Sequence, residues 1–320
     1  MRDNTGIKLF ALNSNPKLSK KIAEGLGVEI CATTVHHFSD GEIQINIDQS
    51  VRGCDVFVIQ SISDPVNENF MELMIMIDAL RRASAGTINC VIPYYGYARA
   101  DRKTRSREPI TAKLIANFLT MAGADRIITL DLHAGQLQGF FNIPMDHLVA
   151  IYDQVKYIKQ QKLDQNVVVV APDHSSVKLA RNLAELLKAP IAIVDKRDKN
   201  RINLADTGVI GDVAGRRCIV YDDLIDTGSK MVDAAAVLKN AGASEIYGLA
   251  THPILSGDAS KELQDSALKK VIVTDTIQIP EEKQFDKLET VSVASIFADA
   301  ISLIYHNQSV DALFNKDDSI

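Results

Sequence analysis

The chain has 320 residues, of which 46% are hydrophobic and 24% charged, with a formal net charge of −6 and a pI of about 5.7. This length suits two domains of about 150 residues each, and the acidic balance excludes bulk attraction to nucleic acid or to an anionic membrane. The four cysteines form no C-x-x-C pair and no apolar run is long enough to cross a bilayer, so we expect reduced thiols and a cytoplasmic protein.

Short apolar runs alternate with helical patterns along the chain. The expected strands are 7–12, 56–60, 88–94, 127–130, 167–171, 191–194, 217–221, 245–251 and 270–274, and the expected helices are 16–26, 69–84, 110–122, 177–187, 231–241 and 294–306. This order predicts an α/β fold with parallel sheets flanked by helices, in which ligands lie outside the carboxyl ends of the strands. Polar residues follow four of the strands, two in each half, which suggests two similar domains joined near residues 146–152.

The first candidate for a site is the segment F-S-D-G-E, which begins at Phe38. It could offer an aromatic face for a base with Asp40 and Glu42 beside it, although a plain turn accounts for the same residues. Residues 39–47 also alternate apolar and polar side chains, which indicates a hairpin edge outside the parallel sheet.

The densest charge cluster is the run R-A-D-R-K-T-R-S-R-E from Arg99 to Glu108, with five bases and two acids in ten residues. In an acidic protein this cluster is a local anion trap, because the planar guanidinium group grips phosphate with two parallel hydrogen bonds. A solvated loop is the plainer interpretation. The run follows a predicted strand, however, and its place at a carboxyl end favours phosphate binding.

Asp131, His133 and Asp173 follow two further predicted strands. Strand side chains alternate with period two, so we expect Asp131 and His133 to point the same way. His133 is as able to donate to a phosphate oxygen as to bind a metal, since Mg²⁺ prefers oxygen ligands. The alternative for His133 is a structural role, and the alternative for Asp173 is to cap the following helix.

Two cationic residues, Lys196 and Arg197, come just after the strand 191–194 and could stabilise a transition state, or form an ordinary exposed loop end. The run R-C-I-V-Y-D-D-L-I-D-T-G-S-K-M at 217–231 predicts a buried strand that ends at the Asp222-Asp223 pair, then a turn and a helix start. A helix N-terminus suits a phosphate, and paired carboxylates suit sugar hydroxyls or Mg²⁺.

These segments resemble class I ribose-phosphate diphosphokinases, which make phosphoribosyl diphosphate (PRPP), over nearly the whole chain. The run V-Y-D-D-L-I-D-T-G is similar to the ribose 5-phosphate loop of that family and also of type I phosphoribosyltransferases. The other motifs occur in family order, namely F-S-D-G-E at Phe38, P-V-N-E-N-F-M-E-L at Pro65, I-P-Y-Y-G-Y-A-R at Ile92, S-R-E-P-I-T-A-K-L at Ser106, D-L-H-A-G-Q-L-Q-G-F-F-N-I-P at Asp131, A-P-D-H at Ala171 and T-H-P-I-L-S-G at Thr251.

The resemblance implies two type I phosphoribosyltransferase-like domains, each a parallel sheet flanked by helices. Residues 1–148 would form the ATP side, with 304–320 packing on them, and residues 149–303 would carry the ribose 5-phosphate loop. The resemblance also implies a homo-hexamer with ATP between subunits, Mg²⁺ as cofactor, and phosphate and ADP as effectors. Neither nucleic acid nor a membrane is an expected partner.

Residue roles follow from the matched motifs. The resemblance implies ATP binding by Phe38, Asp40, Glu42, Arg99, Asp101, Arg107 and His133, metal binding by His133 and Asp173, and ribose 5-phosphate binding by Asp222, Asp223, Asp226, Thr227, Gly228, Ser229 and Lys230. Lys196 and Arg197 are the expected catalytic cations, and effector positions match Ser50, Arg52, Ser84, Gln138 and Asp146.

The chain departs from the family pattern at the predicted site. The departures are Ala100 for Gln, Ser175 and Ser176 for two glycines, Ser229 and Lys230 for Gly and Thr, and Asp198 for a catalytic Arg; His147 also replaces an Asn at an effector position. By analogy with one lost oxyanion donor, which costs roughly 10² to 10³ in rate, these changes leave full activity open.

The sequence therefore leaves three functions open. The first is a Mg²⁺-dependent ribose-phosphate diphosphokinase, a transferase of nucleotide biosynthesis. The second is a weak or inactive regulatory paralogue within a hexamer of such enzymes. The third is a base phosphoribosyltransferase, which accounts for the loop at 222–230 but not for the motifs in the first half.

Overall fold

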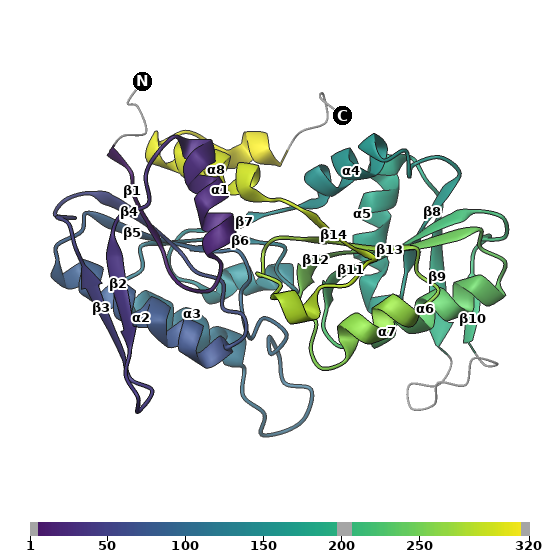
Figure 1. Ribbon diagram of the computed structural model, residues 1–320, viewed down its shortest axis with the longest axis horizontal. Coiled ribbons are helices and arrows are strands. Elements are labelled where there is room, and N and C mark those ends of the chain that lie inside the picture. The colour runs from purple at the N-terminus through teal and green to yellow at the C-terminus, as the bar shows by residue number, and fades with distance from the viewer. Residues whose placement is uncertain (1–5, 197–206, 315–320) are drawn as a thin grey trace. The chain divides into compact units, whose positions relative to one another are not determined.

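The computed structural model describes residues 6–196 and 207–314, without the side chains of Lys196 and Thr207. The chain divides into two compact units, which are described separately and are both drawn in Figure 1. The first unit takes residues up to 149 together with 276–278 and the segment from 292 onward, and the second takes 150–275 and 279–291. Each contains a parallel sheet with helices on both faces, so the predicted α/β class is confirmed.

The first unit is built on a five-stranded parallel sheet with strand order β1-β4-β5-β6-β7. Its elements are β1 (Lys8–Ala11), α1 (Pro16–Leu26), β2 (Thr33–His37), β3 (Ile43–Ile47), β4 (Asp55–Ile59), α2 (Val66–Arg82), β5 (Thr87–Ile92), α3 (Thr111–Ala122), β6 (Arg126–Leu130), η2 (Gly135–Phe140), β7 (Met145–Leu148), α8 (Ala294–Tyr305) and η6 (Val310–Leu313). Strands β2 and β3 form a separate antiparallel hairpin, as the alternation in that stretch predicts.

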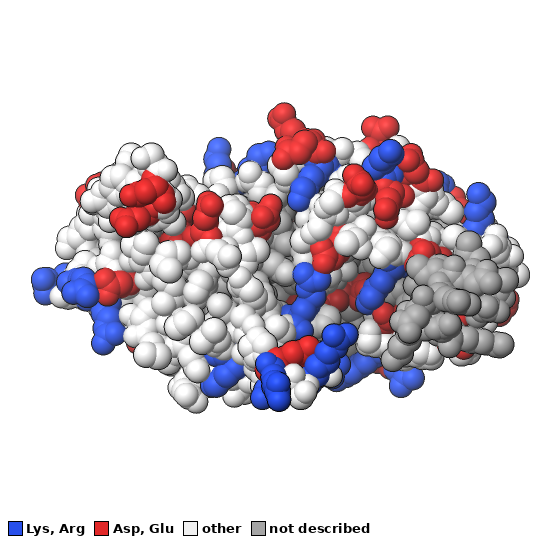
Figure 2. Space-filling view, turned by 90° about the horizontal axis from the view of Figure 1, so that it is seen from below, with Lys and Arg blue, Asp and Glu red and all other residues white. Residues whose placement is uncertain are grey.

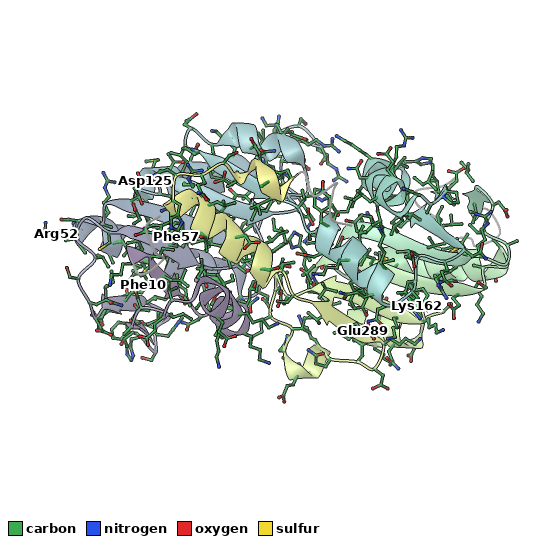
Figure 3. All side chains as sticks on the ribbon, turned by 90° about the horizontal axis from the view of Figure 1, so that it is seen from above. Phe10, Arg52, Phe57, Asp125, Lys162 and Glu289 are labelled. Atoms are coloured by element: carbon green, nitrogen blue, oxygen red, sulfur yellow. The ribbon has the colours of Figure 1, made fainter. Side chains whose placement is uncertain are left out.

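The helices of the first unit lie on opposite faces of its sheet, α2 and α3 on one face and α1 and α8 on the other (Figure 1). Phe10 in β1 and Phe57 in β4 are almost fully buried inside this unit (Figure 3). Helix α1 shows why the sequence forms these elements, since the Asn15 side chain accepts a hydrogen bond from the Leu18 N–H at 3.1 Å and Gly27 closes the helix in the left-handed region. Its apolar stripe then packs on the sheet.

The C-terminal helix α8 returns to the first unit and packs along α1. Phe297 and Ile301 are both fully buried there. The sequence analysis expected only residues 304–320 to pack on the first domain, whereas the whole of α8 does so. The reason is physical: a helix with this much apolar surface needs a partner face, and α1 provides it.

The second unit is built on a seven-stranded sheet with strand order β10-β9-β8-β11-β12-β13-β14. All neighbours pair in parallel except β10 with β9. Its elements are α4 (Ile151–Gln160), β8 (Val167–Ala171), η3 (His174–Ser176), α5 (Val177–Leu187), β9 (Ile191–Lys196), β10 (Thr207–Ile210), β11 (Arg217–Ile225), α6 (Ser229–Asn240), β12 (Glu245–Pro253), α7 (Ala259–Asp265), β13 (Lys270–Thr274), η5 (Glu281–Lys283) and β14 (Leu288–Val291).

The strand order of this second sheet reverses between β8 and β11. From β8 the chain moves through α5 to β9 on one side, and from β11 it moves through α6 to β12 on the other. Helices α4 and α5 pack on one face of the sheet and α6 and α7 on the opposite face. Such a reversal opens a crevice outside the carboxyl ends of the two strands, which is where open α/β sheets bind ligands.

Strand β11 is longer than the sequence analysis expected. We predicted that the strand would end at the two adjacent carboxylates, but β11 continues through Asp222 and Asp223 to Ile225. The neighbouring strand β12 supplies the ladder, since Asp222 pairs with Ala250 and Leu224 with His252. Asp222 is therefore a strand residue with a buried side chain.

In the part of the chain that the structure describes, none of the helices has the length and apolar character needed to traverse a lipid bilayer.

We expect Phe297→Ala to destabilise the first unit by about 3 to 5 kcal/mol, because it removes a fully buried ring from the contact between α8 and the rest of that unit. Hydrogen exchange followed by mass spectrometry should show faster exchange in α1 and β1, with β8 and β11 unchanged. Phe38→Ala is the control, since the Phe38 side chain is 43% exposed and its loss should change exchange much less. Unaltered exchange in α1 would contradict the packing of α8.

Candidate functional site

Two carboxylates lie at the strand reversal of the second unit. Asp173 follows β8, and Asp222 lies in the last part of β11, the strand that pairs directly with β8. The Asp222 side chain is 6% exposed and that of Asp173 is 29% exposed. The candidate site of this unit begins with this pair.

Asp173 caps the short helix η3. Its Oδ1 atom accepts hydrogen bonds from the backbone N–H groups of Ser175 at 2.9 Å and Ser176 at 3.1 Å, and from their hydroxyl groups at 2.5 and 3.2 Å. This is the helix-cap role that the sequence analysis left open. Next to it, His174 Nε2 lies 3.1 Å from Asp195 Oδ1, which ties η3 to β9.

Lys230 connects the two carboxylates. Its Nζ atom lies 2.8 Å from Asp173 Oδ2 and 3.3 Å from Asp222 Oδ2. On the other side, the Ser176 hydroxyl lies 2.9 Å from Asp222 Oδ1 and 3.2 Å from Asp173 Oδ1. The pair is thus joined twice, once through a hydroxyl and once through an ammonium group.

The pKa values of the three groups reflect this arrangement. Burial raises the pKa of Asp222 to about 6, although Lys230 acts to lower it. Burial also acts to raise the pKa of Asp173, but hydrogen bonds from Lys230 and Ser175 outweigh that effect and hold it well below its usual range. Burial acts to lower the pKa of Lys230, and the attraction of Asp222 and Asp173 more than compensates, so this pKa lies above its ordinary value.

The loop between β11 and α6 ends at a helix N-terminus. Gly228, the N-cap residue, has φ +81°, and a Cβ at this position would lie 3.2 Å from Leu263 Cγ, so a larger residue would be strained. No side chain caps α6, and the hydroxyl groups of Thr227 and Ser229 lie 3.1 Å apart just before and at its first residue. Uncapped N–H groups with hydroxyls beside them suit a phosphate.

The same carboxylates do not fit a protein-held metal ion as they stand. Asp173 uses Oδ1 to cap η3 and Oδ2 to pair with Lys230. Within residues 6–196 and 207–314, moreover, no group of three or more His, Cys, Asp or Glu side chains could hold a metal. A divalent cation at Asp173 would have to displace the Lys230 ammonium.

In the first unit, the basic cluster lies in a long loop between β5 and α3. Strand β5 ends at Ile92, the following Tyr94 and Tyr95 are buried, and most of the charged side chains beyond them are exposed. Glu108 folds the loop back on itself, since its carboxylate accepts hydrogen bonds from the N–H groups of Thr104 and Arg105. Figure 2 looks onto this loop, where Lys and Arg side chains surround the acidic ones.

The residues after β6 meet this loop. Gln136 Nε2 donates to Asp101 Oδ2 at 3.2 Å, which brings the segment containing His133 next to the basic loop. Strand β6 ends at Leu130, and Asp131 has φ +39°, so strand alternation does not determine where Asp131 and His133 point, and their common direction stays a prediction. Both residues make contacts of their own.

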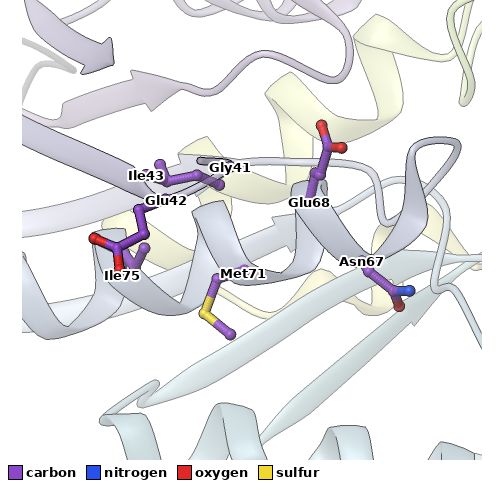
Figure 4. A pocket seen from close by; sticks show the side chains of 7 residues that line it. All are labelled: Gly41, Glu42, Ile43, Asn67, Glu68, Met71 and Ile75. Atoms are coloured by element: carbon purple, nitrogen blue, oxygen red, sulfur yellow. The ribbon is translucent and has the colours of Figure 1, made fainter. Parts of the chain in front are cut away.

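The tip of the β2–β3 hairpin carries Phe38, Asp40 and Glu42. The Glu42 N–H donates to Asp40 Oδ1 at 3.1 Å, so Asp40 shapes the turn, while Phe38 is 43% exposed. Glu42 also lines a cavity of about 490 Å³ against α2, with Gly41, Ile43, Asn67, Glu68, Met71 and Ile75 (Figure 4). In Figure 1 the hairpin tip and the loop after β5 are separate projections of the first unit.

The five expected effector residues do not form one cluster in the first unit. Arg52, labelled in Figure 3, lies beside Ser84 at the edge formed by the amino ends of β4 and β5, where Gly53 N–H donates to the Ser84 carbonyl at 2.8 Å. Gln138 lies in η2, beyond the carboxyl end of β6. Asp146 pairs with Arg126 at 2.6 Å, and Ser50 is exposed.

For several residues with a predicted role, the structure gives no side-chain position. Arg197 and Asp198 lie outside the described residues, and the same holds for the side chain of Lys196. Their catalytic roles stay predictions. In contrast, Ser176 was considered only as a departure from a family pattern, and the structure makes it a contact of both carboxylates. The order Asp173-His174-Ser175-Ser176 before a helix is an N-cap pattern that could have indicated this contact.

Comparison with known proteins gives a consistent result. The model of the N-terminal domain of ribose phosphate pyrophosphokinase matches residues 7–123, and that of the phosphoribosyl synthetase-associated domain matches residues 201–315. Ribose-phosphate pyrophosphokinase 1 of Listeria innocua is 55% identical over 309 residues, which cover 96% of this chain and 97% of the relative. The ribose-phosphate pyrophosphokinase of Bacillus caldolyticus is 56% identical over 310 residues, covering 97% and 98%. The crystal structure of phosphoribosylpyrophosphate synthetase from Mycobacterium smegmatis superposes with a TM-score of 0.89 at 42% identity, covering 94% of this chain and 99% of that one.

We expect Asp222→Asn to change how the free energy of unfolding depends on pH. A carboxyl group whose pKa is raised from 3.8 to about 6 by folding takes up protons on folding between these values. Its contribution to stability is therefore fully present below about pH 3.8 and is lost as the pH rises through about 6. Since one pKa unit is worth about 1.4 kcal/mol, the change is on the order of 3 kcal/mol.

Urea denaturation at pH 4, 5 and 6.5 measures this effect as the difference between the wild type and Asp222→Asn. Asp173, whose lowered pKa destabilises the protein as the pH falls below about 4, makes its opposite contribution mainly below this range. A difference that stays constant from pH 4 to pH 6.5 would contradict the raised pKa.

Proposed function

The chain belongs to the ribose-phosphate pyrophosphokinase family, and on that premise we propose that it transfers the diphosphoryl group of ATP to O1 of ribose 5-phosphate. The products are PRPP, a precursor in nucleotide biosynthesis, and AMP. The observation that carries this proposal is identity of 54 to 57% to ribose-phosphate pyrophosphokinases across both units of the chain.

We assign ribose 5-phosphate to the second unit. Its phosphate would lie against the uncapped first turn of α6, with the hydroxyls of Thr227 and Ser229 beside it. Asp222, Asp223 and Asp226 would face the sugar, because carboxylates accept hydrogen bonds from its hydroxyl groups. The strand reversal between β8 and β11 supports this assignment, since a ligand there meets residues from both strands.

We assign ATP to the first unit. The exposed guanidinium groups of Arg99 and Arg107, together with His133, would meet its phosphates. The contact between Gln136 and Asp101 supports this proposal because it joins the two segments that carry these residues. Phe38, with Asp40 and Glu42, would provide the exposed aromatic face for adenine from a neighbouring subunit.

The reaction forms a bond between O1 of the sugar and the β-phosphorus of ATP. It breaks the bond between that phosphorus and the oxygen that bridges the α- and β-phosphates, and this oxygen leaves on AMP. Positioning and neutralisation of charge do most of the work in such a displacement. In our proposal Lys196 and Arg197 supply cations at the transferring group.

Mg²⁺ enters this proposal as a complex with the triphosphate of ATP, near His133. When bound there it neutralises charge on the phosphate oxygens. The pairing of Asp173 with Lys230 means that Asp173 would meet the ion only after the ammonium group moves away. We propose a cytoplasmic location, which agrees with the free state of all four cysteines in the structure.

We further propose a homo-hexamer, with phosphate and ADP acting where subunits meet at Ser50, Arg52, Ser84, Gln138 and Asp146. Exposed apolar side chains on α2 and α3 support an assembly through the first unit. They are Met71, Leu114, Phe118 and Met121, and Met121 is 76% exposed. Figure 2 shows that this face of the first unit is nearly free of charged side chains. An apolar face of this kind marks an interaction surface.

Purified protein should release AMP when ATP, Mg²⁺ and ribose 5-phosphate are all present, and in amounts equal to the PRPP formed. A kinase of ordinary efficiency would turn over on the order of 1 to 100 times per second. Chromatography of the nucleotides measures AMP and would separate it from ADP. Absence of AMP, or production of ADP in its place, would refute the proposed function.

Arg99→Ala is the informative variant in this assay. Loss of a charge-assisted hydrogen bond of about 1.5 to 3 kcal/mol should lower kcat/KM for ATP roughly 10- to 100-fold. Arg82→Ala is the matched control, because Arg82 is an exposed residue of α2 that pairs with Asp78 within its own helix. It should leave kcat/KM unchanged.

Met121→Asp should disrupt the assembly, because it places a charge on the apolar face of α3. Light scattering coupled to size exclusion should report six times the chain mass of 35.1 kDa for the wild type and a smaller species for the variant. Ile210→Asp is the control, since Ile210 is also exposed, at 54%, but lies in the second unit. If Met121→Asp still forms a hexamer, the apolar face of α2 and α3 is not the interface.

A further inference from the structure

We propose that the ammonium group of Lys230 takes the place of a protein-held divalent cation between Asp173 and Asp222. The inference depends on the proposed function only because that function brings Mg²⁺ to the protein. The proposal rests on the geometry of the second unit and can be tested without ATP or ribose 5-phosphate.

The two carboxylates need a cation between them. Both lie within reach of the same hydroxyl, since Ser176 Oγ is 2.9 Å from Asp222 Oδ1 and 3.2 Å from Asp173 Oδ1. Two carboxylates this close repel each other unless one is protonated or a cation lies nearby. Asp222 is held by its pairing with Ala250 of β12 and Asp173 by its place at the N-cap of η3, so neither residue is free to shift.

Lys230 provides that cation from a fixed position. It is the second residue of α6, between Ser229 and Met231, and Met231 is buried against the sheet of the second unit. The Lys230 side chain is 49% exposed along its length, yet its Nζ atom reaches the Oδ2 atoms of both carboxylates at 2.8 and 3.3 Å. A tethered ammonium of this kind cannot diffuse away, whereas a bound metal ion can.

The distances match an ammonium group and not a metal. A nitrogen cation donates to oxygen at about 2.7 to 3.2 Å, whereas Mg²⁺ requires oxygens at about 2.0 to 2.1 Å. A metal ion at the position of Lys230 Nζ would need both carboxylates to move inward by roughly 1 Å. If the ammonium were removed, however, the two Oδ2 atoms would face a common empty position with uncompensated negative charge. Such a position attracts a divalent cation.

The consequence is a different metal requirement. At this edge of the sheet, the chain needs no divalent cation to hold its two carboxylates together, and the divalent cation that the reaction uses is the one carried by ATP. Replacing Lys230 by an uncharged residue should therefore create a metal site that the wild type does not have.

Binding of Mn²⁺ to the full chain without nucleotide or sugar phosphate tests this proposal. Electron paramagnetic resonance of free Mn²⁺ gives the stoichiometry and the affinity. We expect no stoichiometric site in the wild type and one site per chain in Lys230→Met, with affinity at least tenfold higher than any residual binding in the wild type. The double variant Lys230→Met with Asp173→Asn should lose that site.

Two further variants test whether it is the positive charge at residue 230 that prevents metal binding. Lys230→Arg keeps a cation and should resemble the wild type, while Lys239→Met removes an exposed lysine from the same helix and should gain no site. If Lys230→Met proves unstable, Mn²⁺ binding to the wild type still tests the proposal. One Mn²⁺ bound tightly per wild-type chain and lost in Asp173→Asn would overturn the proposal, and so would a folded Lys230→Met that binds none.

Discussion

The contact of one ammonium group, that of Lys230, with two carboxylates, Asp173 and Asp222, is the interaction on which the candidate site of the second unit depends. The parallel pairing of β8 with β11 brings Asp173 and Asp222 to the same edge of the sheet, where the strand order reverses. The Asp222 side chain is buried and that of Asp173 is partly buried, so their charge has to be balanced by neighbours. Lys230 supplies the positive charge and Ser176 a hydrogen bond, and burial raises the pKa of Asp222 to about 6 while the pKa of Asp173 stays well below its usual range.

Much of this fold could be predicted because its strands and helices differ in period and in composition. Buried parallel strands such as β8 consist of apolar β-branched residues, and the amphipathic α5 follows it with helical spacing. The end of β11 could not be predicted in the same way, because two adjacent aspartates ordinarily mark an exit from a sheet. Only the partner strand β12, whose polar Thr251 and His252 are buried with it, shows that the ladder continues.

The candidate site was predictable as a set of residues but not as a set of contacts. The sequence places Asp173 and Asp222 at strand ends and Lys230 at a helix start, and motif resemblance assigns Asp173 to a metal ion and the other two to ribose 5-phosphate. It does not show that one ammonium group reaches both carboxylates, since that contact depends on which strands are neighbours. Likewise, the positive φ of Asp131 reflects local backbone geometry, which no alternation of side chains encodes.

The shared core of α1 and α8 has a consequence for biosynthesis. The first unit obtains its last layer from a helix near the other end of the chain, with Phe297 and Ile301 filling the space beside α1. While the ribosome is still adding residues, the part of this face that α8 covers therefore remains open, even though the strands of the second sheet, up to residue 291, have already been made. The unit that is translated first is thus the last to be completed, and until then its open face is a surface that chaperones can bind.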